Sequence, residues 1–216
     1  MDTTREYWDR RYTAEGKIWG ENPSLTALRA LELFQKAGAR SILVPGSGYG
    51  RHTAFFSKSG FEVTGIEISP VAVDLARQFD PLSRFYNASV LEMSSEYGLY
   101  DAVNRFDAVY CFNVLHLFLE NQRAKFIQGC ADRLKTNGRM FFSVFSEKET
   151  DFGKGTAVEE NTFETRPGRP AHYFTEDDLK QHFARYLIKD MGLMEDPEDH
   201  GGKPHTHILR YICVEI

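Results

Sequence analysis

Three glycines at alternating positions, together with one acidic residue, are the strongest signal for chemistry in this chain. Gly46, Gly48 and Gly50 follow an apolar segment and precede a helix-forming one. Glycine lets the backbone approach a ligand closely, and the free N–H groups at a helix start face that ligand. The next apolar segment ends at Glu67, whose carboxylate can accept hydrogen bonds from ribose hydroxyls. The pair predicts a nucleoside-binding crevice and is favoured over a purely structural tight turn.

The spacing of the glycines narrows the class of ligand. Dinucleotide-binding turns favour G-x-G-x-x-G/A, whereas position 51 of this chain is Arg, which disfavours a nicotinamide enzyme. The chain contains no Gly-Lys-Ser/Thr phosphate loop, so hydrolysis of a nucleoside triphosphate has no support.

Histidines supply the other candidates for chemistry. His116 and His172 are possible proton acceptors, although a lone histidine is more often structural. His205 and His207 would share one face of a strand, as metal ligands can. Together with His200 they also fit a solvated polar hairpin loop, because no Cys accompanies them and the flanking acids lack calcium-loop spacing. We favour the loop and expect no bound metal.

Alternating strands and helices must position these residues. A helix is expected to begin after Ser24 and to end at Gly38. Apolar patterns predict strands over 41–44, 61–66, 84–88, 106–112 and 139–145, and helices over 51–59, 70–79 and about 121–134. The helix over 70–79 begins behind Ser69. Such alternation predicts an α/β fold with a mostly parallel sheet and helices on both faces.

The last third of the chain has a different pattern. Residues 146–171 are polar, contain several Gly and Pro, and lack periodicity, which predicts a long loop. Thr175 is the expected N-cap of a helix that runs to about Phe183. Strands are predicted over 185–189 and 206–214. Their irregular connection indicates an antiparallel pair.

The composition of the chain narrows its possible domain organisation, binding partners and location. The 216 residues, 42% hydrophobic and 26% charged, suit one folded domain. The net charge of −5 offers no general attraction to nucleic acids or anionic membranes. Cys111, Cys130 and Cys213 lie in apolar patterns and are expected to be reduced core residues. We predict no signal peptide and no membrane span, and expect a cytoplasmic monomer or homodimer.

The glycine turn and the acid together resemble the class I S-adenosylmethionine-dependent methyltransferases, and the resemblance extends from about residue 25 to the C terminus. Residues 106–120 (FDAVYCFNVLHLFLE) and 173–179 (YFTEDDL) are similar to the tellurite-resistance methyltransferase group. Residues 7–12 (YWDRRY), 19–24 (WGENPS) and 44–46 (VPG) resemble thiopurine and thiol/halide methyltransferases. The resemblance implies a three-layer Rossmann-like fold with a seven-stranded, mostly parallel sheet and an antiparallel C-terminal hairpin.

The same resemblance implies S-adenosylmethionine as methyl donor, S-adenosylhomocysteine as product and no metal. Many relatives carry an acid two residues before the first glycine, where this chain has Val44, and another near the position of Ser89. The donor-binding residues that it implies are Gly46, Ser47, Gly48, Arg51, Glu67, Ile68, Ser89, Val90 and Asn113. Arg51 has an equally favoured alternative as a solvent-facing helix residue.

The acceptor is expected to be a small soluble nucleophile, because little chain remains with which to bind a large one. Its predicted contacts are Tyr7, Tyr12, Trp19, Arg169 and Tyr173, whereas Trp8 is expected to pack against a helix. A thiolate or chalcogen oxyanion would need no base, and an amine or hydroxyl would favour His116 or His172 as base.

We expect one domain, with an aromatic lid (1–23), a donor-binding core (24–145), a substrate loop (146–171) and a closing helix and hairpin (172–216). Two alternatives stay open. The chain could be a non-catalytic donor-binding sensor, or it could methylate RNA or protein through a patch beginning at Arg166 and Arg169.

Overall fold

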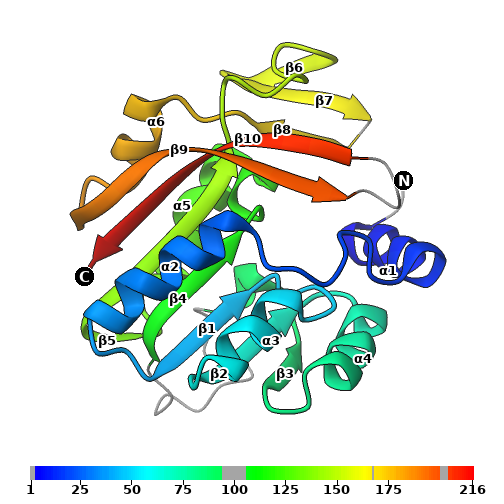
Figure 1. Cartoon of the computed structure of the whole chain (residues 1–216). Helices are drawn as coiled ribbons and strands as arrows, with labels where there is room; N and C mark the ends of the chain where they lie inside the picture. The colour runs from blue at the N-terminus through cyan, green and yellow to red at the C-terminus, as the bar shows by residue number, and fades with distance from the viewer. Residues whose placement is uncertain (1–2, 94–105, 167, 200–203) are drawn as a thin grey trace.

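The computed structural model describes residues 3–93, 106–166, 168–199 and 204–216 (Figure 1). Its strands are β1 (Ser41–Pro45), β2 (Glu62–Glu67), β3 (Arg84–Asn87), β4 (Phe106–Phe112), β5 (Leu134–Phe145), β6 (Thr156–Glu159), β7 (Thr162–Arg166), β8 (Arg169–His172), β9 (Leu187–Asp199) and β10 (Pro204–Glu215). Its helices are α1 (Thr4–Glu15), α2 (Leu25–Lys36), α3 (Arg51–Lys58), α4 (Pro70–Phe79), α5 (Glu120–Ala131) and α6 (Glu176–His182), with short 3-10 turns η1 (Val90–Glu92) and η2 (Leu115–Leu117).

Seven strands form the main sheet in the order β3-β2-β1-β4-β5-β10-β9. The first five pair in parallel, whereas β10 is antiparallel to both β5 and β9. This is a mixed α/β Rossmann-like fold, and the predicted fold class is confirmed. Because β1, β2, β4 and β5 are parallel, their carboxyl ends meet at one edge of the sheet, which is where the glycine loop lies.

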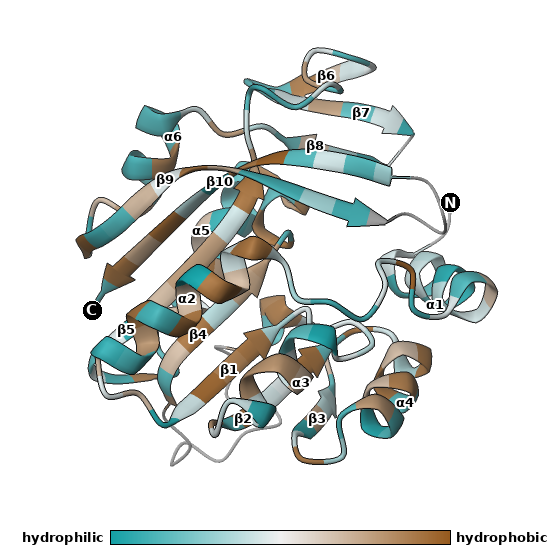
Figure 2. Ribbon diagram, in the orientation of Figure 1, coloured by the Kyte–Doolittle hydropathy of each residue, from teal (hydrophilic) through white to brown (hydrophobic). Residues whose placement is uncertain are grey.

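Two hydrophobic cores cover the two faces of this sheet. One joins α2 and α3 to the sheet and includes Phe34, Phe56 and Tyr110. The other joins α5 and α6 to the opposite face and includes Phe126 and Phe142. In Figure 1, α2 and α3 lie in front of the sheet and α5 behind it. Figure 2 shows that the strands between them are mostly hydrophobic.

Local capping chemistry explains the helix starts. The side chains of Ser24, Ser69 and Thr175 each accept a hydrogen bond from the backbone N–H three residues later, as predicted. At the N terminus the structure adds a helix that hydrophobic periodicity did not indicate. This helix, α1, begins with a capping box at Thr3 and packs against α4.

The predicted loop over 146–171 is wrong in its central part. Strands β6, β7 and β8 form a separate antiparallel sheet there. Its residues are mostly half-buried or exposed, so the alternation that marks a core strand is missing from the sequence. Buried Thr162 and His172 face each other across β7 and β8.

The C-terminal hairpin is also longer than predicted. The predicted irregular connection over 191–205 is largely strand, because β9 and β10 pair from Pro204 opposite Asp199 to Glu215 opposite Leu187. In Figure 2 the N-terminal part of β10 is hydrophilic and its C-terminal part hydrophobic. Polar residues that suggested a loop are thus paired in a two-stranded extension of the sheet.

The three cysteines are buried free thiols, in agreement with their predicted place in the core. In the part of the chain that the structure describes, no helix is long and apolar enough to cross a membrane.

Candidate functional site

The loop after β1 turns sharply because its three glycines adopt left-handed backbone conformations. The φ angles of Gly46, Gly48 and Gly50 are 68°, 55° and 90°, which L side chains rarely adopt. A Cβ atom at position 46 would collide with Val114, and one at position 48 would lie 2.8 Å from the hydroxyl oxygen of Tyr12. Neighbouring side chains therefore pack directly on the loop backbone.

The Glu67 carboxylate joins this loop to the end of β2. Its Oε2 accepts a hydrogen bond from the Gly48 N–H at 3.0 Å, and its Oε1 accepts one from the Ser69 N–H at 2.9 Å. Burial raises the pKa of Glu67, and the two backbone hydrogen bonds oppose that rise. Because each carboxylate oxygen has a further lone pair, Glu67 can order the loop and also accept hydrogen bonds from a ligand.

Three buried side-chain oxygens without partners lie toward the carboxyl ends of the neighbouring strands. Ser47 Oγ follows β1, Asn113 Oδ1 follows β4 and Ser143 Oγ lies near the end of β5; none of the three has a hydrogen-bond partner among the described residues. Such a group costs about 1–3 kcal/mol when it stays unsatisfied. Hydrogen bonds from a polar ligand at these strand ends would remove this cost, so the residues fit the amino-acid and nucleoside groups of a ligand such as S-adenosylmethionine.

Ile68 and Ser89 follow the carboxyl ends of the neighbouring strands β2 and β3. The Ile68 carbonyl accepts hydrogen bonds from Arg5 Nε at 3.2 Å and from Asn87 Nδ2 at 2.9 Å. Ser89 Oγ caps η1, and Val90 is buried beside it. Helix α1 is therefore attached to the strand ends where the predicted adenine contacts lie.

The N-terminal aromatic residues form one cluster, and they differ in their relation to the loop. Trp19 stacks on Tyr49 with ring centroids 6.2 Å apart and lies 6.2 Å from Trp8. Tyr12 is buried, with its hydroxyl against Gly48. Tyr12 thus lies against the backbone of the glycine loop at Gly48, whereas Trp19 packs on the Tyr49 side chain of that loop and on Trp8.

Arg51 is buried, so the alternative that it faces solvent is wrong. Its guanidinium donates to the Trp19 carbonyl at 2.9 Å, forms an ion pair with Glu198 and lies 5.1 Å from the Phe112 ring centroid. Both ions are less than 10% exposed. This pair links the start of α3 to β9.

His116 lies flat against the last residue of β5. Its ring stacks on Phe145 with centroids 3.8 Å apart, and its Nδ1 accepts a weak hydrogen bond from the Phe145 N–H at 3.4 Å. Burial, reinforced by His207 and His172, lowers the pKa of His116 to about 3. The ring is therefore neutral near pH 7 and a poor proton acceptor.

His172 has both ring nitrogens engaged. Nδ1 lies 2.8 Å from Thr162 Oγ1 and Nε2 lies 2.6 Å from Asp178 Oδ2. The residue is 3% exposed. This geometry suits a structural link between β8 and α6 better than a base that faces the crevice.

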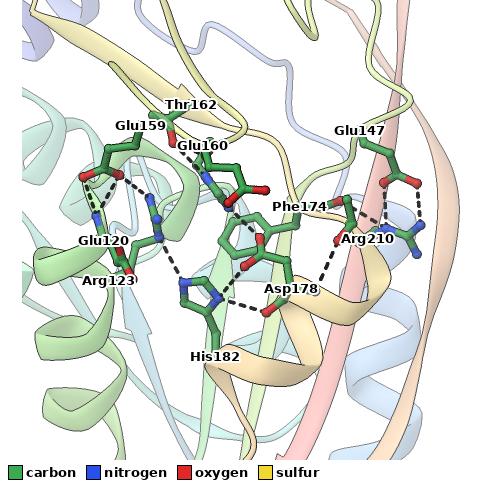
Figure 3. Close-up of polar contacts among 12 residues, drawn as sticks. Glu120, Arg123, Glu147, Glu159, Glu160, Thr162, Phe174, Asp178, His182 and Arg210 are labelled. Carbon is green, nitrogen blue, oxygen red and sulfur yellow. Dashed lines mark hydrogen bonds and ion pairs between the residues drawn. The ribbon is translucent and has the colours of Figure 1, made fainter. Parts of the chain in front are cut away.

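Asp178 extends this link into a polar network, part of which is drawn in Figure 3. Its carboxylate lies 3.1 Å from His182 Nδ1, and His182 Nε2 accepts a hydrogen bond from Arg123 Nε at 3.1 Å. Arg123 in turn pairs with Glu159 of β6 at 3.4 Å. Burial alone would raise the pKa of Asp178, but the hydrogen bonds from the two histidines hold that pKa well below its ordinary value.

The remaining predicted acceptor residues lie around the small sheet. The Arg169 guanidinium sits 3.9 Å from the ring centroid of Tyr7, so the structure brings these two together. Tyr173 is buried and stacks on Phe145 at 6.0 Å. Tyr7 and Arg169 thus connect α1 to β8.

Several residues at this edge were missed by sequence reasoning. Arg5, Asn87, Glu149 and Glu198 have no local pattern that marks them, because their partners lie far away along the chain. The one usable signal was the spacing of His205 and His207, but it was attributed to a solvated loop. That interpretation is wrong for His207, which is buried on β10, and His200 lies outside the described residues.

Comparisons with known proteins find similarity to methyltransferases. Residues 43–142 match the family described as a methyltransferase domain. The ubiquinone biosynthesis O-methyltransferase of Xanthomonas axonopodis pv. citri (strain 306) is 27% identical over 164 residues, which are 76% of this chain and 66% of that protein. A glycine/sarcosine N-methyltransferase of Parasynechococcus marenigrum (strain WH8102) is 31% identical over 137 residues, 61% of this chain and 43% of that protein. The matches thus span less than two thirds of either relative.

A similar solved structure comes from work on the conversion of a disulfide bond into a thioacetal group during echinomycin biosynthesis. It superposes with a TM-score of 0.75 and 17% identity, over 99% of this chain and 92% of that one. At this identity the likeness concerns the fold.

Proposed function

We propose that this chain is a class I, S-adenosylmethionine-dependent methyltransferase and that it methylates a small soluble nucleophile, such as a thiol or a chalcogen oxyanion. The match of residues 43–142 to the methyltransferase-domain family supports the first part of this proposal. The tellurite-resistance and thiol methyltransferases are the groups whose chemistry fits this proposal. The observation that carries the proposal has two parts. Buried side-chain oxygens near the glycine loop lack hydrogen-bond partners among the described residues, and the nearby histidines are poorly placed to act as bases.

In this proposal, the methyl donor is bound by backbone groups and by side-chain oxygens that have no hydrogen-bond partner within the described part of the protein. Bound S-adenosylmethionine supplies a methyl group on a positively charged sulfur, which an acceptor displaces in line. Ser47 and Asn113 would bind its amino-acid part, and Glu67 its ribose hydroxyls. Ile68, Ser89 and Val90 would contact the adenine. Tyr12 would cover the crevice and exclude water.

The acceptor side favours a nucleophile that is already anionic. His116 is neutral with a pKa of about 3, and both nitrogens of His172 are occupied. An amine or a hydroxyl would need a base to remove its proton, whereas a thiolate or a chalcogen oxyanion would not. Alignment and desolvation then suffice for transfer.

The proposal also concerns the size of the acceptor. Tyr7 on α1 and Arg169 on β8 contact each other, and Arg169 Nη2 lies 3.4 Å from the Thr3 carbonyl oxygen. In this proposal the contacts keep α1 next to the acceptor, which suits a small molecule better than RNA or a folded protein. We therefore favour a small acceptor.

The test is transfer of a radiolabelled methyl group from S-adenosylmethionine to a panel of thiols, tellurite, selenite, halides, amines and phenols. We expect turnover with one or more soft anions and less than a tenth of that rate with amines. Calorimetry with S-adenosylhomocysteine is the companion measurement. Tight binding of this product without turnover on any acceptor would instead identify a sensor, and the absence of binding at millimolar concentration would exclude the proposal.

A further inference from the structure

A histidine–carboxylate cluster lies beyond the donor crevice, at the carboxyl end of β5. Glu149 follows that strand, and His205 and His207 lie two residues apart on β10, so both project from the same face. One ligand atom from each of the three residues lies within 4.8 Å of the others. Glu149 and His207 are buried, and His205 is partly exposed.

The surroundings of His207 favour a bound cation. Its Nδ1 is 3.1 Å from Glu149 Oε1, and its Nε2 is 3.6 Å from Glu198 Oε2. His207 Nδ1 and Glu149 Oε1 are already within hydrogen-bond distance of each other. A metal ion bound by both atoms would replace this contact with two coordinate bonds and would leave Nε2 facing Glu198.

The neighbours of the cluster already hold its members in place. Glu149 Oε1 accepts a hydrogen bond from the Ile208 N–H at 2.7 Å, and the His207 ring stacks on Phe145 with centroids 5.1 Å apart. Glu198, which is paired with Arg51, is placed to orient His207 through its second nitrogen. An outer carboxylate that orients a ligating histidine is a recurrent feature of metal sites.

We propose that Glu149, His205 and His207 form a binding site for a divalent transition-metal ion of the Zn²⁺ type. Two imidazoles and one carboxylate are ligands that suit such ions. The 3.1 Å between His207 Nδ1 and Glu149 Oε1 is close to the spacing of about 3.3 Å between two ligands with bonds of about 2.0 Å on a tetrahedral ion. Three protein ligands leave a fourth position for water or another small ligand.

The site does not depend on the proposed methyl transfer, although it lies beside the same crevice. Phe145 contacts His116 on one side and His207 on the other, and the Arg51–Glu198 pair connects the cluster to the start of α3. A metal ion there would lie next to β5, β9 and β10 and not at the glycine loop.

The test measures zinc binding directly, on the full chain after removal of any affinity tag. Competition with a chromophoric zinc chelator gives stoichiometry and affinity, and the visible absorption of added Co²⁺ reports coordination geometry. We expect one ion per chain with a tetrahedral spectrum. His205→Ala and Glu149→Gln should each weaken zinc affinity at least about 100-fold, beyond the 10–100-fold effect of losing an outer partner.

Glu195→Gln is the matched control, because Glu195 is an exposed carboxylate on β9 opposite Ile208. Its zinc affinity should equal that of the parent. Calorimetry with S-adenosylhomocysteine shows whether each variant is folded, and it separates failure of the metal site from failure of the proposed function. The absence of bound zinc at micromolar concentration, or equal zinc affinity in the parent and in His205→Ala, overturns the site.

Discussion

The proposed donor side, around the glycine loop, and the proposed acceptor side, around the small sheet of β6, β7 and β8, differ in how their polar groups are satisfied. On the donor side, Ser47 and Asn113 present oxygens without partners, and backbone N–H groups surround Glu67. On the acceptor side, His172 and Asp178 belong to a network of side chains that already bind one another. The first arrangement is ready to bind a polar ligand. The second holds β8, α5 and α6 together, and it engages both ring nitrogens of His172.

One buried ion pair crosses between the two sides and gives the largest expected effect. Arg51→Met leaves Glu198 buried beside the two histidines of β10 without its cation, which should destabilise the fold by about 3–5 kcal/mol. Denaturant unfolding followed by circular dichroism measures this loss. The double variant Arg51→Met/Glu198→Met removes both charges and should recover most of the stability. If Arg51→Met alone is as stable as the parent, the two sides are independent.

The second prediction concerns the donor side alone. Glu67→Ala removes a carboxylate that accepts two backbone hydrogen bonds, each worth about 1.5–3 kcal/mol when the acceptor is charged. We expect the dissociation constant for S-adenosylhomocysteine to rise about 10–100-fold in calorimetry. Glu62→Ala, an exposed acid at the start of the same strand, is the control and should bind normally. Unchanged affinity in Glu67→Ala would contradict the assignment of this crevice to the donor.

The third prediction tests whether the acceptor-side network is structural. The pKa of Asp178 is lowered in the folded state, so its contribution to stability is fully present above its ordinary value of about 3.8 and is lost as the pH falls toward the lower folded value. Asp178→Asn should therefore cost about 1–2 kcal/mol at pH 7 and progressively less below pH 4.

Urea unfolding of Asp178→Asn at several pH values is the measurement. Asp177→Asn changes the exposed neighbour on the same helix and should leave the pH profile of the parent unaltered. A difference between Asp178→Asn and the parent that does not shrink on acidification would show that the carboxylate charge is unimportant.

The smallest effect is expected where α1 meets the small sheet. Arg169→Ala removes a cation–π contact with Tyr7 that is worth about 0.5–1 kcal/mol at an exposed site. Thermal stability should change little, whereas KM for the acceptor should rise a few-fold with kcat nearly unchanged. Arg166→Ala, on exposed β7, is the control. Equal kinetics in both variants would remove Arg169 from the acceptor side.

Local sequence patterns were sufficient to predict much of the fold. The N-caps Ser24, Ser69 and Thr175 were predictable because a cap needs only a side chain and the backbone a few residues away. The parallel strands were predictable because burial on both faces leaves near-continuous apolar runs. By contrast, β6, β7 and β8 are mostly exposed or half-buried, so no such run marks them.

The sequence alone determined the glycine loop, the acid at the end of β2 and the alternating order of strands and helices. These features depend on backbone conformation and strand burial, which residues close together in the sequence decide. Only the tertiary structure decided which side chains share a site. Arg51 and Glu198 are 147 residues apart, and Glu149 and His207 are 58 apart. Pairing across such separations depends on the strand register of β9 and β10 and on where β5 ends. A one-residue shift in that register would turn these groups to the opposite face of the sheet.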